Sequence, residues 1–265
     1  MKGIICYYSG SGNTRLACRY IAERIKNAEF DLYDIIREKS AAPDLAQFDI
    51  VGFATFTDFF GPPHLLHTFV DGLPRQHGKP AFILNTYGNV TGRTIKAMQR
   101  LVTSRGFRVV AGHSLYTPES YPPMVASGRG HEHRPDERDM EEFTDFIGYV
   151  DQSLADLRRG KPVKTSIRIR LLDRFCPVLP RDWSRRFMGD KFVDQELCIQ
   201  CGVCERKCPY GAIALEPKPV FDMEECMGCW ACYNHCAQKA IYTAKLRGVG
   251  HYPKPAPQLK KKLGA

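Results

Sequence analysis

The 265-residue sequence lacks any run of eighteen apolar residues, and no signal-peptide pattern opens it. A membrane-spanning helix needs about 20 mostly apolar residues, and a secretory signal needs a basic start followed by an apolar stretch. We therefore predict a cytoplasmic protein without membrane insertion. Disulfides persist in oxidising compartments, so the eleven cysteines are not expected to pair with one another.

Several common catalytic and nucleotide-binding motifs are also missing. The chain has no Gly-Lys-Ser/Thr step, no Gly-x-Gly-x-x-Gly fingerprint, and no HxxxH or HExxH pair among its eight histidines. These motifs mark NTPase loops, dinucleotide sites and histidine-ligated zinc. No Ser-His-Asp arrangement can be argued either. The sequence thus gives no support to an NTPase, a zinc hydrolase or a nicotinamide-binding domain.

Cysteine is abundant in one place, because eight of the eleven cysteines lie between residues 198 and 236 in two copies of one spacing. The two runs are Cys198, Cys201, Cys204 and Cys208, then Cys226, Cys229, Cys232 and Cys236. Soft thiolates at such spacing suit iron–sulfur clusters or zinc. A four-cysteine zinc site would use two CxxC pairs and leave the other cysteines of each run without a role. We therefore predict two [4Fe-4S] clusters.

The ligand sets are expected to cross between the two runs. In the bacterial cluster-binding run, the fourth cysteine ligates the cluster held by the first three cysteines of the other motif. The first cluster is then assigned to Cys198, Cys201, Cys204 and Cys236. The second is assigned to Cys226, Cys229, Cys232 and Cys208.

The segment around these cysteines resembles the two-cluster bacterial ferredoxins. The resemblance includes the sequence Cys-Pro-Tyr-Gly-Ala-Ile at residues 208–213. A short strand-like segment follows each run, at residues 212–215 and 240–243, so the region is an internal duplication. The second copy departs from the family pattern because Ala237 stands where proline is usual, which removes no ligand.

The first forty residues predict an anion site. An apolar strand at residues 2–8 ends in a polar turn, which a helical pattern follows. The turn is Ser9, Gly10, Ser11, Gly12, Asn13 and Thr14. A helix start presents backbone N–H groups and a favourable dipole to phosphate. A serine-rich helix cap without a ligand is the alternative for such a turn.

Further strands are expected at residues 30–34, 50–54, 81–87 and 108–115, alternating with helices at about 63–72, 92–105 and 135–159. This alternation predicts an α/β fold with a parallel sheet between helices and a ligand site beyond the carboxyl ends of its strands. Here the chain resembles flavodoxin over about 150 residues, because residues 9–14 match the flavodoxin phosphate loop, Ser/Thr-x-Ser/Thr-Gly-Asn-Thr, at every position. The resemblance implies a doubly wound five-stranded sheet of order 2-1-3-4-5, followed by a small α+β two-cluster domain.

The flavodoxin resemblance also implies FMN as a cofactor. Besides the loop at residues 9–14, it implicates two later loops, which would hold the flavin ring: Thr55, Phe56 and Thr57, then Asn85, Tyr87, Gly88 and Asn89. A tryptophan usually stacks on the ring after the third strand. Here the candidates are Phe56, Phe59 and Phe60.

Four units are expected along the chain: a flavodoxin-like domain at 1–160, a basic connecting segment at 161–191, a two-cluster domain at 192–247 and a frayed basic tail at 248–265. The connecting segment is too apolar for a floppy linker and is expected to pack across both domains, with a membrane-surface helix as the alternative. The long segment 116–134 should be irregular and cover the flavin or line the passage to the clusters. Cys6, Cys18 and Cys176 are expected to be buried, inert thiols.

The net charge differs between the two parts of the chain. Residues 1–160 carry 19 Lys and Arg against 19 Asp and Glu, whereas residues 161–265 carry 19 against 10. A basic surface favours acidic redox partner proteins, and without a recognition motif we expect no nucleic-acid binding. The two resemblances together match fused flavodoxin–ferredoxin proteins, which implies an electron carrier. Two alternative functions stay open: an FMN-dependent reductase of a small molecule such as a quinone, and a redox sensor. Formation of a homodimer also stays open.

Overall fold

The computed structural model describes residues 1–37, 42–169, 173, 176 and 181–264. Its N-terminal part is built on a six-stranded sheet with the order β2-β1-β3-β4-β5-β6, in which every pairing is parallel. The strands are β1 (Lys2–Tyr7), β2 (Glu29–Asp34), β3 (Ile50–Phe56), β4 (Pro80–Tyr87), β5 (Arg108–Tyr116) and β6 (Ser166–Ile167). The order of the first five strands is that of flavodoxin-like sheets, so the predicted fold is confirmed.

The predicted number of five strands is wrong, because the connecting segment adds β6 beside β5. Ser166 pairs with Ala111, and Ile167 pairs with Gly112. A two-residue strand has too little alternation to be recognised in a sequence. Ile167 and Ile169 pack against a buried cluster of the sheet, so the start of the connecting segment belongs to the first domain's core.

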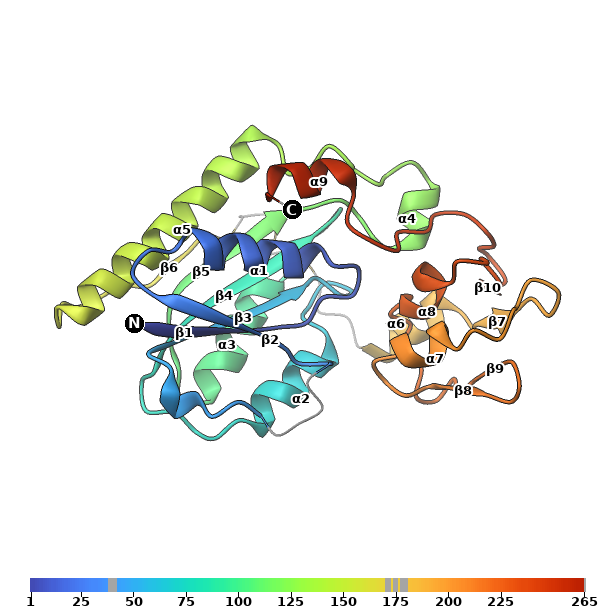
Figure 1. The fold of residues 1–265 in the computed structure, drawn as a ribbon, viewed down its shortest axis with the longest axis horizontal. Coiled ribbons are helices and arrows are strands. Elements are labelled where there is room, and N and C mark those ends of the chain that lie inside the picture. The colour runs from blue at the N-terminus through green and yellow to red at the C-terminus, as the bar shows by residue number, and fades with distance from the viewer. Residues whose placement is uncertain (38–41, 170–172, 174–175, 177–180, 265) are drawn as a thin grey trace.

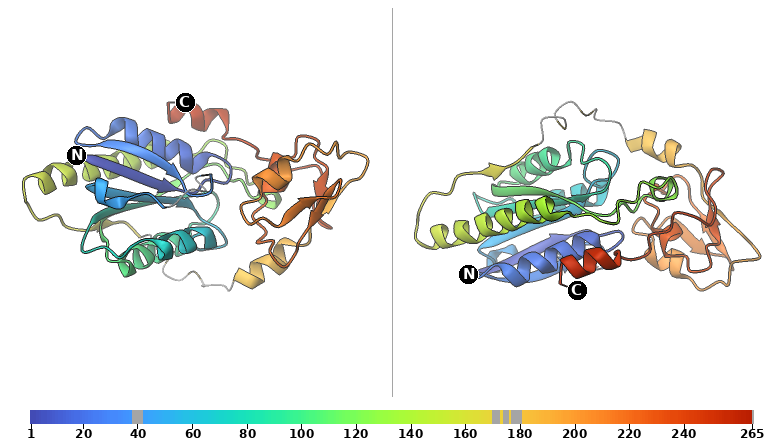
Figure 2. Two further views of the ribbon diagram at one scale, coloured as in Figure 1. Left: turned by 60° about the horizontal axis from the view of Figure 1, so that its bottom comes forward. Right: turned by 90° about the horizontal axis from the view of Figure 1, so that it is seen from above.

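Helices cover both faces of this sheet (Figures 1 and 2). One face packs against α1 (Asn13–Arg24) and α5 (Glu137–Arg158), and the other against α2 (His64–Gly72) and α3 (Thr94–Ser104). A short 3-10 helix, η1 (Leu45–Gln47), precedes β3. The central strands β3 and β4 are buried almost throughout, as expected for a parallel sheet covered on both sides.

The long helix α5 begins and ends as its sequence predicts. Asp136 accepts from the backbone N–H of Asp139, and the Asp139 carboxylate accepts from that of Asp136, which forms a capping box. Phe143, Val150 and Leu154 are fully buried on its inner face. The helix therefore closes the sheet without reaching the ligand end.

The C-terminal part carries the two cysteine runs on two similar units. Its elements are β7 (Phe192–Val193), α7 (Val203–Lys207), β8 (Ile213–Leu215), β9 (Pro219–Phe221), α8 (Ala231–His235) and β10 (Ile241–Tyr242). Strands β8 and β9 form one antiparallel pair, and β7 and β10 form another. Helices α7 and α8 occupy equivalent positions in the two runs, and each begins after a residue with positive φ, Gly202 and Trp230 respectively. The domain lies beyond the carboxyl ends of the parallel strands (Figure 1).

The expectation of a frayed tail is wrong. Residues 257–262 form helix α9 (Pro257–Lys262), which lies beside α1 in each view of Figures 1 and 2. Leu259 is fully buried and Leu263 is 2% exposed in the core that includes α1 and α5. Lys262 donates to the carbonyls of His133 and Pro135. The three successive lysines that indicate a solvated tail are flanked by two leucines that enter the core.

Two smaller expectations are also corrected. The segment 116–134 contains helix α4 (Pro122–Ala126), which starts with two prolines in its first turn, where proline is tolerated. Of the three remaining cysteines, Cys6 and Cys18 are buried as predicted, whereas Cys176 is only half-buried. For the connecting segment, the prediction at residues 170–172, 174–175 and 177–180 falls outside the described residues. No helix within the described ranges is long and apolar enough to cross a bilayer.

Candidate functional site

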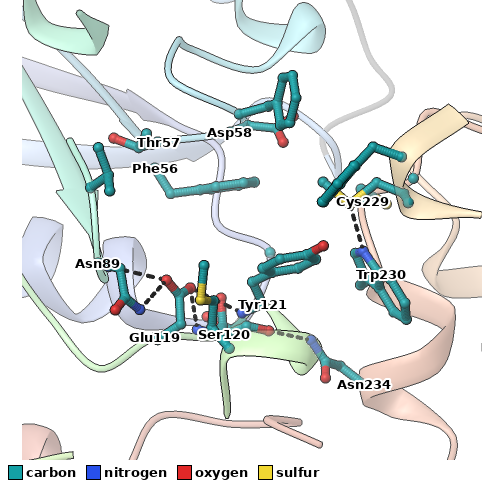
Figure 3. A pocket seen from close by; sticks show the side chains of 18 of the residues that line it. Phe56, Thr57, Asp58, Asn89, Glu119, Ser120, Tyr121, Cys229, Trp230 and Asn234 are labelled. Carbon is teal, nitrogen blue, oxygen red and sulfur yellow. Dashed lines mark hydrogen bonds between the residues drawn. The ribbon is translucent and has the colours of Figure 1, made fainter. Parts of the chain in front are cut away.

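A cavity of about 890 Å³ lies between the two domains, at the carboxyl ends of β1, β3 and β4. Its walls come from four loops of the sheet, from helix α6 (Arg181–Met188) of the connecting segment, and from the second cysteine run. Apolar side chains dominate, with a few polar groups between them, which is typical of cofactor pockets. In Figure 3 the Phe56 ring points into this space from the sheet side, opposite Tyr121 and Cys229.

The predicted phosphate loop forms one end of the cavity through Gly10 and Ser11. The Ser9 hydroxyl accepts from the backbone N–H groups of Gly12 at 3.1 Å and Arg15 at 3.2 Å, which fixes the turn. Gly12 has φ 101°, a conformation in which glycine is favoured. Among the described residues, no hydrogen bond uses the backbone N–H of Ser11 or Thr14. These groups at the start of α1 are donors for an anion.

The other predicted flavin residues divide into those that line the cavity and those that support it. Phe56, Thr57 and Asn89 line it. Fully buried Asn85 donates to the Thr57 hydroxyl at 2.9 Å and so positions it. Behind the loop, the Thr14 and Thr86 hydroxyl groups form a hydrogen bond, with 2.9 Å between their oxygens.

Eight predicted residues do not line the cavity. Two of them are the supporting residues Thr14 and Asn85, and five more are Ser9, Gly12, Asn13, Thr55 and Tyr87. Thr55 is fully buried within β3, and the Tyr87 ring stacks on Tyr116 with 4.9 Å between centroids. Gly88 is also outside the lining and lies against the Glu119 carboxylate. Its role is close packing, because a Cβ there would lie 2.4 Å from that carboxylate.

The loop after β3 presents two further phenylalanines to the cavity. Phe59 and Phe60 both have positive φ, 49° and 69°, within a turn closed by two backbone hydrogen bonds between Asp58 and Gly61. Consecutive positive φ values define a type I′ turn, which is usually built from glycine, asparagine or aspartate. Bulky residues are uncommon in this conformation. In this chain the turn places the rings of Phe59 and Phe60 on the cavity wall.

Sequence reasoning expected the segment 116–134 to cover the flavin or line the passage to the clusters, but it named no individual residue of the remaining wall. The segment 116–134 contributes Glu119, Ser120, Tyr121 and Met124, and α6 contributes Trp183, Phe187 and Met188. Trp183 is 62% exposed and Phe187 is 65% exposed, a large apolar area to leave uncovered. The sequence signal that could have identified Trp183 and Phe187 is their spacing of four residues, which places both side chains on one face of a helix.

Glu119 organises the loop that it belongs to. Its carboxylate accepts from the backbone N–H of Asn89 at 3.1 Å and from the Asn89 amide at 3.0 Å, and also from the N–H groups of Ser120 and Tyr121. A carboxylate with so many donors is well fixed. Figure 3 shows the Asn89 and Ser120 contacts at the floor of the cavity.

Two small cavities in the C-terminal domain each gather four cysteines. One is lined by Cys208, Cys226, Cys229 and Cys232, and the other by Cys198, Cys201, Cys204 and Cys236. These are the two crossed sets expected from the sequence. Each set lines a cavity, and among the described side chains no group of three or more His, Cys, Asp or Glu is arranged to hold a single metal ion. Four soft thiol donors around a space fit a cubane cluster.

The fourth cysteines have matching hydrogen bonds. The backbone N–H of Ala212 donates to the Cys208 sulfur, and that of Ala240 donates to the Cys236 sulfur, both at 3.3 Å. Burial raises the pKa of the Cys229 thiol to about 12 and also raises the pKa of Cys232 and Cys204. Such thiols need a strong cation to hold them as thiolates.

The two kinds of cavity share a wall. Cys229, Trp230 and Ala231 line both the large cavity and the small one that holds Cys208, Cys226 and Cys232. The set containing Cys198 lines neither. One cysteine group is therefore proximal to the large cavity, and the other is distal.

Hydrogen bonds hold the domains in this arrangement. Asn234 of α8 donates to the Ser120 carbonyl at 3.0 Å and accepts from the backbone N–H of Tyr252. The Tyr252 hydroxyl donates to the Asn13 side chain at 3.0 Å, and His235 Nε2 lies 3.4 Å from the Gly10 carbonyl oxygen. The second cysteine run thus contacts both the phosphate loop and the segment 116–134.

Comparison with known proteins identifies the C-terminal part. The model of the 4Fe-4S binding domain family matches residues 191–214. The delta subunit of an NADH-dependent phenylglyoxylate dehydrogenase from Aromatoleum evansii is 38% identical over 65 residues, which are 24% of this chain and 66% of that protein. One component of an ion-translocating oxidoreductase complex from Methanosarcina acetivorans is 49% identical over 52 residues, 19% and 20% of the two chains. The chain thus covers at most 66% of the length of these two relatives.

A solved flavodoxin from Bacillus cereus matches 61% of this chain and all of its own, with 19% identity and a TM-score of 0.43. The assignment of the N-terminal fold rests on the strand order of this chain. The protein therefore combines a flavodoxin-like fold with a C-terminal 4Fe-4S binding domain.

Proposed function

We propose that this protein is an electron carrier that holds FMN in the large cavity and one [4Fe-4S] cluster in each cysteine-lined cavity. The observation that carries the proposal is the shared wall: Cys229 and Trp230 separate the large cavity from the proximal cysteine set. When bound, FMN exchanges two electrons, whereas each cubane exchanges one. A chain that sets the two kinds of centre on either side of one wall is suited to pass electrons between them.

Each part of the cavity has a task in this proposal. The backbone N–H groups of Ser11 and Thr14, at the start of α1, bind the phosphate. The rings of Phe56, Phe59, Tyr121 and Trp183, all in the cavity lining, hold the flavin ring by stacking. Asn89 and Thr57, fixed by Glu119 and Asn85, supply polar contacts at its edge. The C-terminal domain covers the cavity and limits access of water to it.

Partner proteins with acidic surfaces suit the charge of the chain. Residues 161–265 carry nine more basic than acidic groups, and two of the relatives are components of oxidoreductases. Association rates with an acidic donor should therefore fall as ionic strength rises. A rate that does not depend on salt would exclude this mode of docking.

Anaerobic purification tests the proposal directly. We expect one FMN and about eight iron atoms per chain, since each cubane holds four. After mixing with limiting dithionite, bleaching of the flavin should follow bleaching of the clusters at a rate that does not depend on protein concentration. A protein lacking either centre, or a flavin rate proportional to protein concentration, would contradict electron transfer within one chain.

Substitution of Trp183 tests the position of the flavin. Trp183→Leu should weaken FMN binding about fivefold to tenfold, because a stacked aromatic ring contributes ~1 kcal/mol beyond its buried area. Titration of FMN, followed by quenching of its own fluorescence, measures the change. Leu32→Ala, at an exposed position of the edge strand β2, is the control and should leave the affinity unchanged. Equal affinities for the Trp183 variant and the wild type would place the flavin elsewhere.

A second function is favoured by the open edge of the cavity. Trp183 and Phe187 leave a large apolar surface exposed there, which a planar acceptor such as a quinone could contact. In this case the protein would be an FMN-dependent reductase supplied by its clusters. Steady-state reduction of soluble quinones, with reduced ferredoxin as donor, would favour the reductase, whereas turnover at the uncatalysed rate would favour the carrier.

A further inference from the structure

Lys191 is a buried lysine in the C-terminal domain, only 4% exposed. Its ammonium group donates to the Gly189 carbonyl at 2.9 Å and lies 4.1 Å from the centre of the Trp230 ring. Lysine is almost never fully buried unless a partner compensates its charge. In the described structure, no carboxylate forms an ion pair with Lys191.

The proximal cysteine set lies on the same cavity wall as this buried lysine. Lys191 lines the small cavity together with Cys208, Cys226, Cys229 and Cys232. Burial lowers the pKa of Lys191, and the nearby Cys226, Cys232 and Cys229 act in the opposite direction. Lys191 therefore borders the same cavity as the four proximal cysteines.

The distal cavity has no such group. Its lining contains Cys198, Cys201, Cys204 and Cys236, and the other lining residues are apolar or uncharged, such as Ile199 and Gln238. Arg206 donates to the Cys201 carbonyl beside the distal set, but it is exposed. The internal duplication thus produces two sites with the same ligands, of which only the proximal one has a buried cation on its wall.

One acidic group opposes Lys191. Asp58 acts on Cys229 in the direction that raises its pKa, as expected of a negative charge nearby. Asp58 lies in the wall of the large, open cavity and is half-buried, so solvent screens it more than it screens Lys191. Asp190, the chain neighbour of Lys191, is exposed. Of these three charged groups, the Lys191 ammonium is therefore the one that solvent screens least from the proximal cysteine set.

We propose that Lys191 makes the two clusters unequal, so that the first electron added to the oxidised pair resides on the proximal cluster. The step is the transfer of one electron from a reduced partner protein, which is oxidised by one electron, to one cubane, whose net charge becomes more negative by one, with no proton transferred. Cluster potentials depend on net charge and solvent exposure, and a buried cation favours the more negative state. This inference rests on the proposed function, because it requires the two cysteine sets to hold clusters.

The first electron added to the oxidised pair therefore has a defined location. It lies on the cluster whose ligand Cys229 borders the large cavity, next to the proposed flavin site. The distal cluster, with exposed Cys201, is then the lower-potential centre that meets the external donor.

A redox titration of the holoprotein followed by electron paramagnetic resonance tests this assignment. The wild type should show two cluster potentials. Lys191→Met keeps the apolar stem and removes the charge, and it should lower only the higher potential by about 59 mV, a tenfold change in the one-electron equilibrium. The exposed Lys239, which follows Cys236, gives the matched control Lys239→Met, for which no shift of this size is expected.

A second variant keeps the test decisive if Lys191→Met does not fold. Ile199 lines the distal cavity and is 63% exposed, so Ile199→Lys should be tolerated and should raise the lower potential. Equal potentials in the wild type, a shift of both clusters in Lys191→Met, or a rise of the higher potential in Ile199→Lys would overturn the inference. Loss of the proposed function itself would appear earlier, as a wild type without about eight iron atoms.

Discussion

Leu259→Ala is expected to lower the free energy of unfolding of the N-terminal domain by about 3 kcal/mol, the usual cost of removing a fully buried leucine side chain. Leu259 has no exposed surface and packs into the core cluster that contains residues of α1 and α5. The effect should therefore be seen in a domain more than 100 residues away in the chain. It would show that α9 is part of that domain's core.

Chemical unfolding under anaerobic conditions, followed by circular dichroism, measures this change. Because two-domain proteins often unfold in more than one step, the transition of the flavodoxin-like part is followed separately from the loss of cluster absorbance. Val249→Ala is the control, since Val249 is 52% exposed in the same C-terminal stretch and surface changes are usually within about 0.5 kcal/mol. An unchanged transition in Leu259→Ala would mean that α9 is detached in solution.

Serine in place of Cys208 or Cys236 is expected to remove one whole cluster, which leaves about four of about eight iron atoms per chain. The crossed ligand sets make a sharper prediction. Cys208→Ser and Cys229→Ser should lose the same cluster, so the potentials and resonance spectra of the remaining cluster should agree. Cys236→Ser and Cys201→Ser should form the other matching pair.

The half-buried Cys176 provides the control, because Cys176→Ser should retain about eight iron atoms. If Cys208→Ser instead matched Cys201→Ser, each cluster would be held by a single run. The two cavities, each lined by three cysteines of one run and the fourth of the other, would then misrepresent the ligand sets.

Local patterns predicted the alternation of strands and helices well, because apolar runs alternate with amphipathic helices. The strand order β2-β1-β3-β4-β5 is the one that the resemblance to flavodoxin implies, and the crossed cysteine sets stay a prediction from the spacing of the two runs. Helix α5 was recognised by its first and last turns. These features are encoded by residues that are close together in the chain.

The parts that were missed depend on contacts between distant segments. Trp183 lies about 120 residues from Phe59 in the chain, and only the folded arrangement brings α6 and the β3 loop to one cavity. The amphipathic signal of α9 covers six residues, too few to identify a buried helix. Lys191 looks like any other basic residue until its burial is known.

The contact between the two ends of the chain determines when the phosphate loop can acquire its final surroundings. A Cβ on Gly12 would lie 2.9 Å from the Pro255 ring, and the Asn13 side chain accepts from the Tyr252 hydroxyl. During biosynthesis an N-terminal domain folds first, yet Tyr252 and Pro255 follow both cysteine runs in the chain and are synthesised after them. The nascent sheet therefore emerges with an uncovered loop, which is closed only after both cysteine runs have been made.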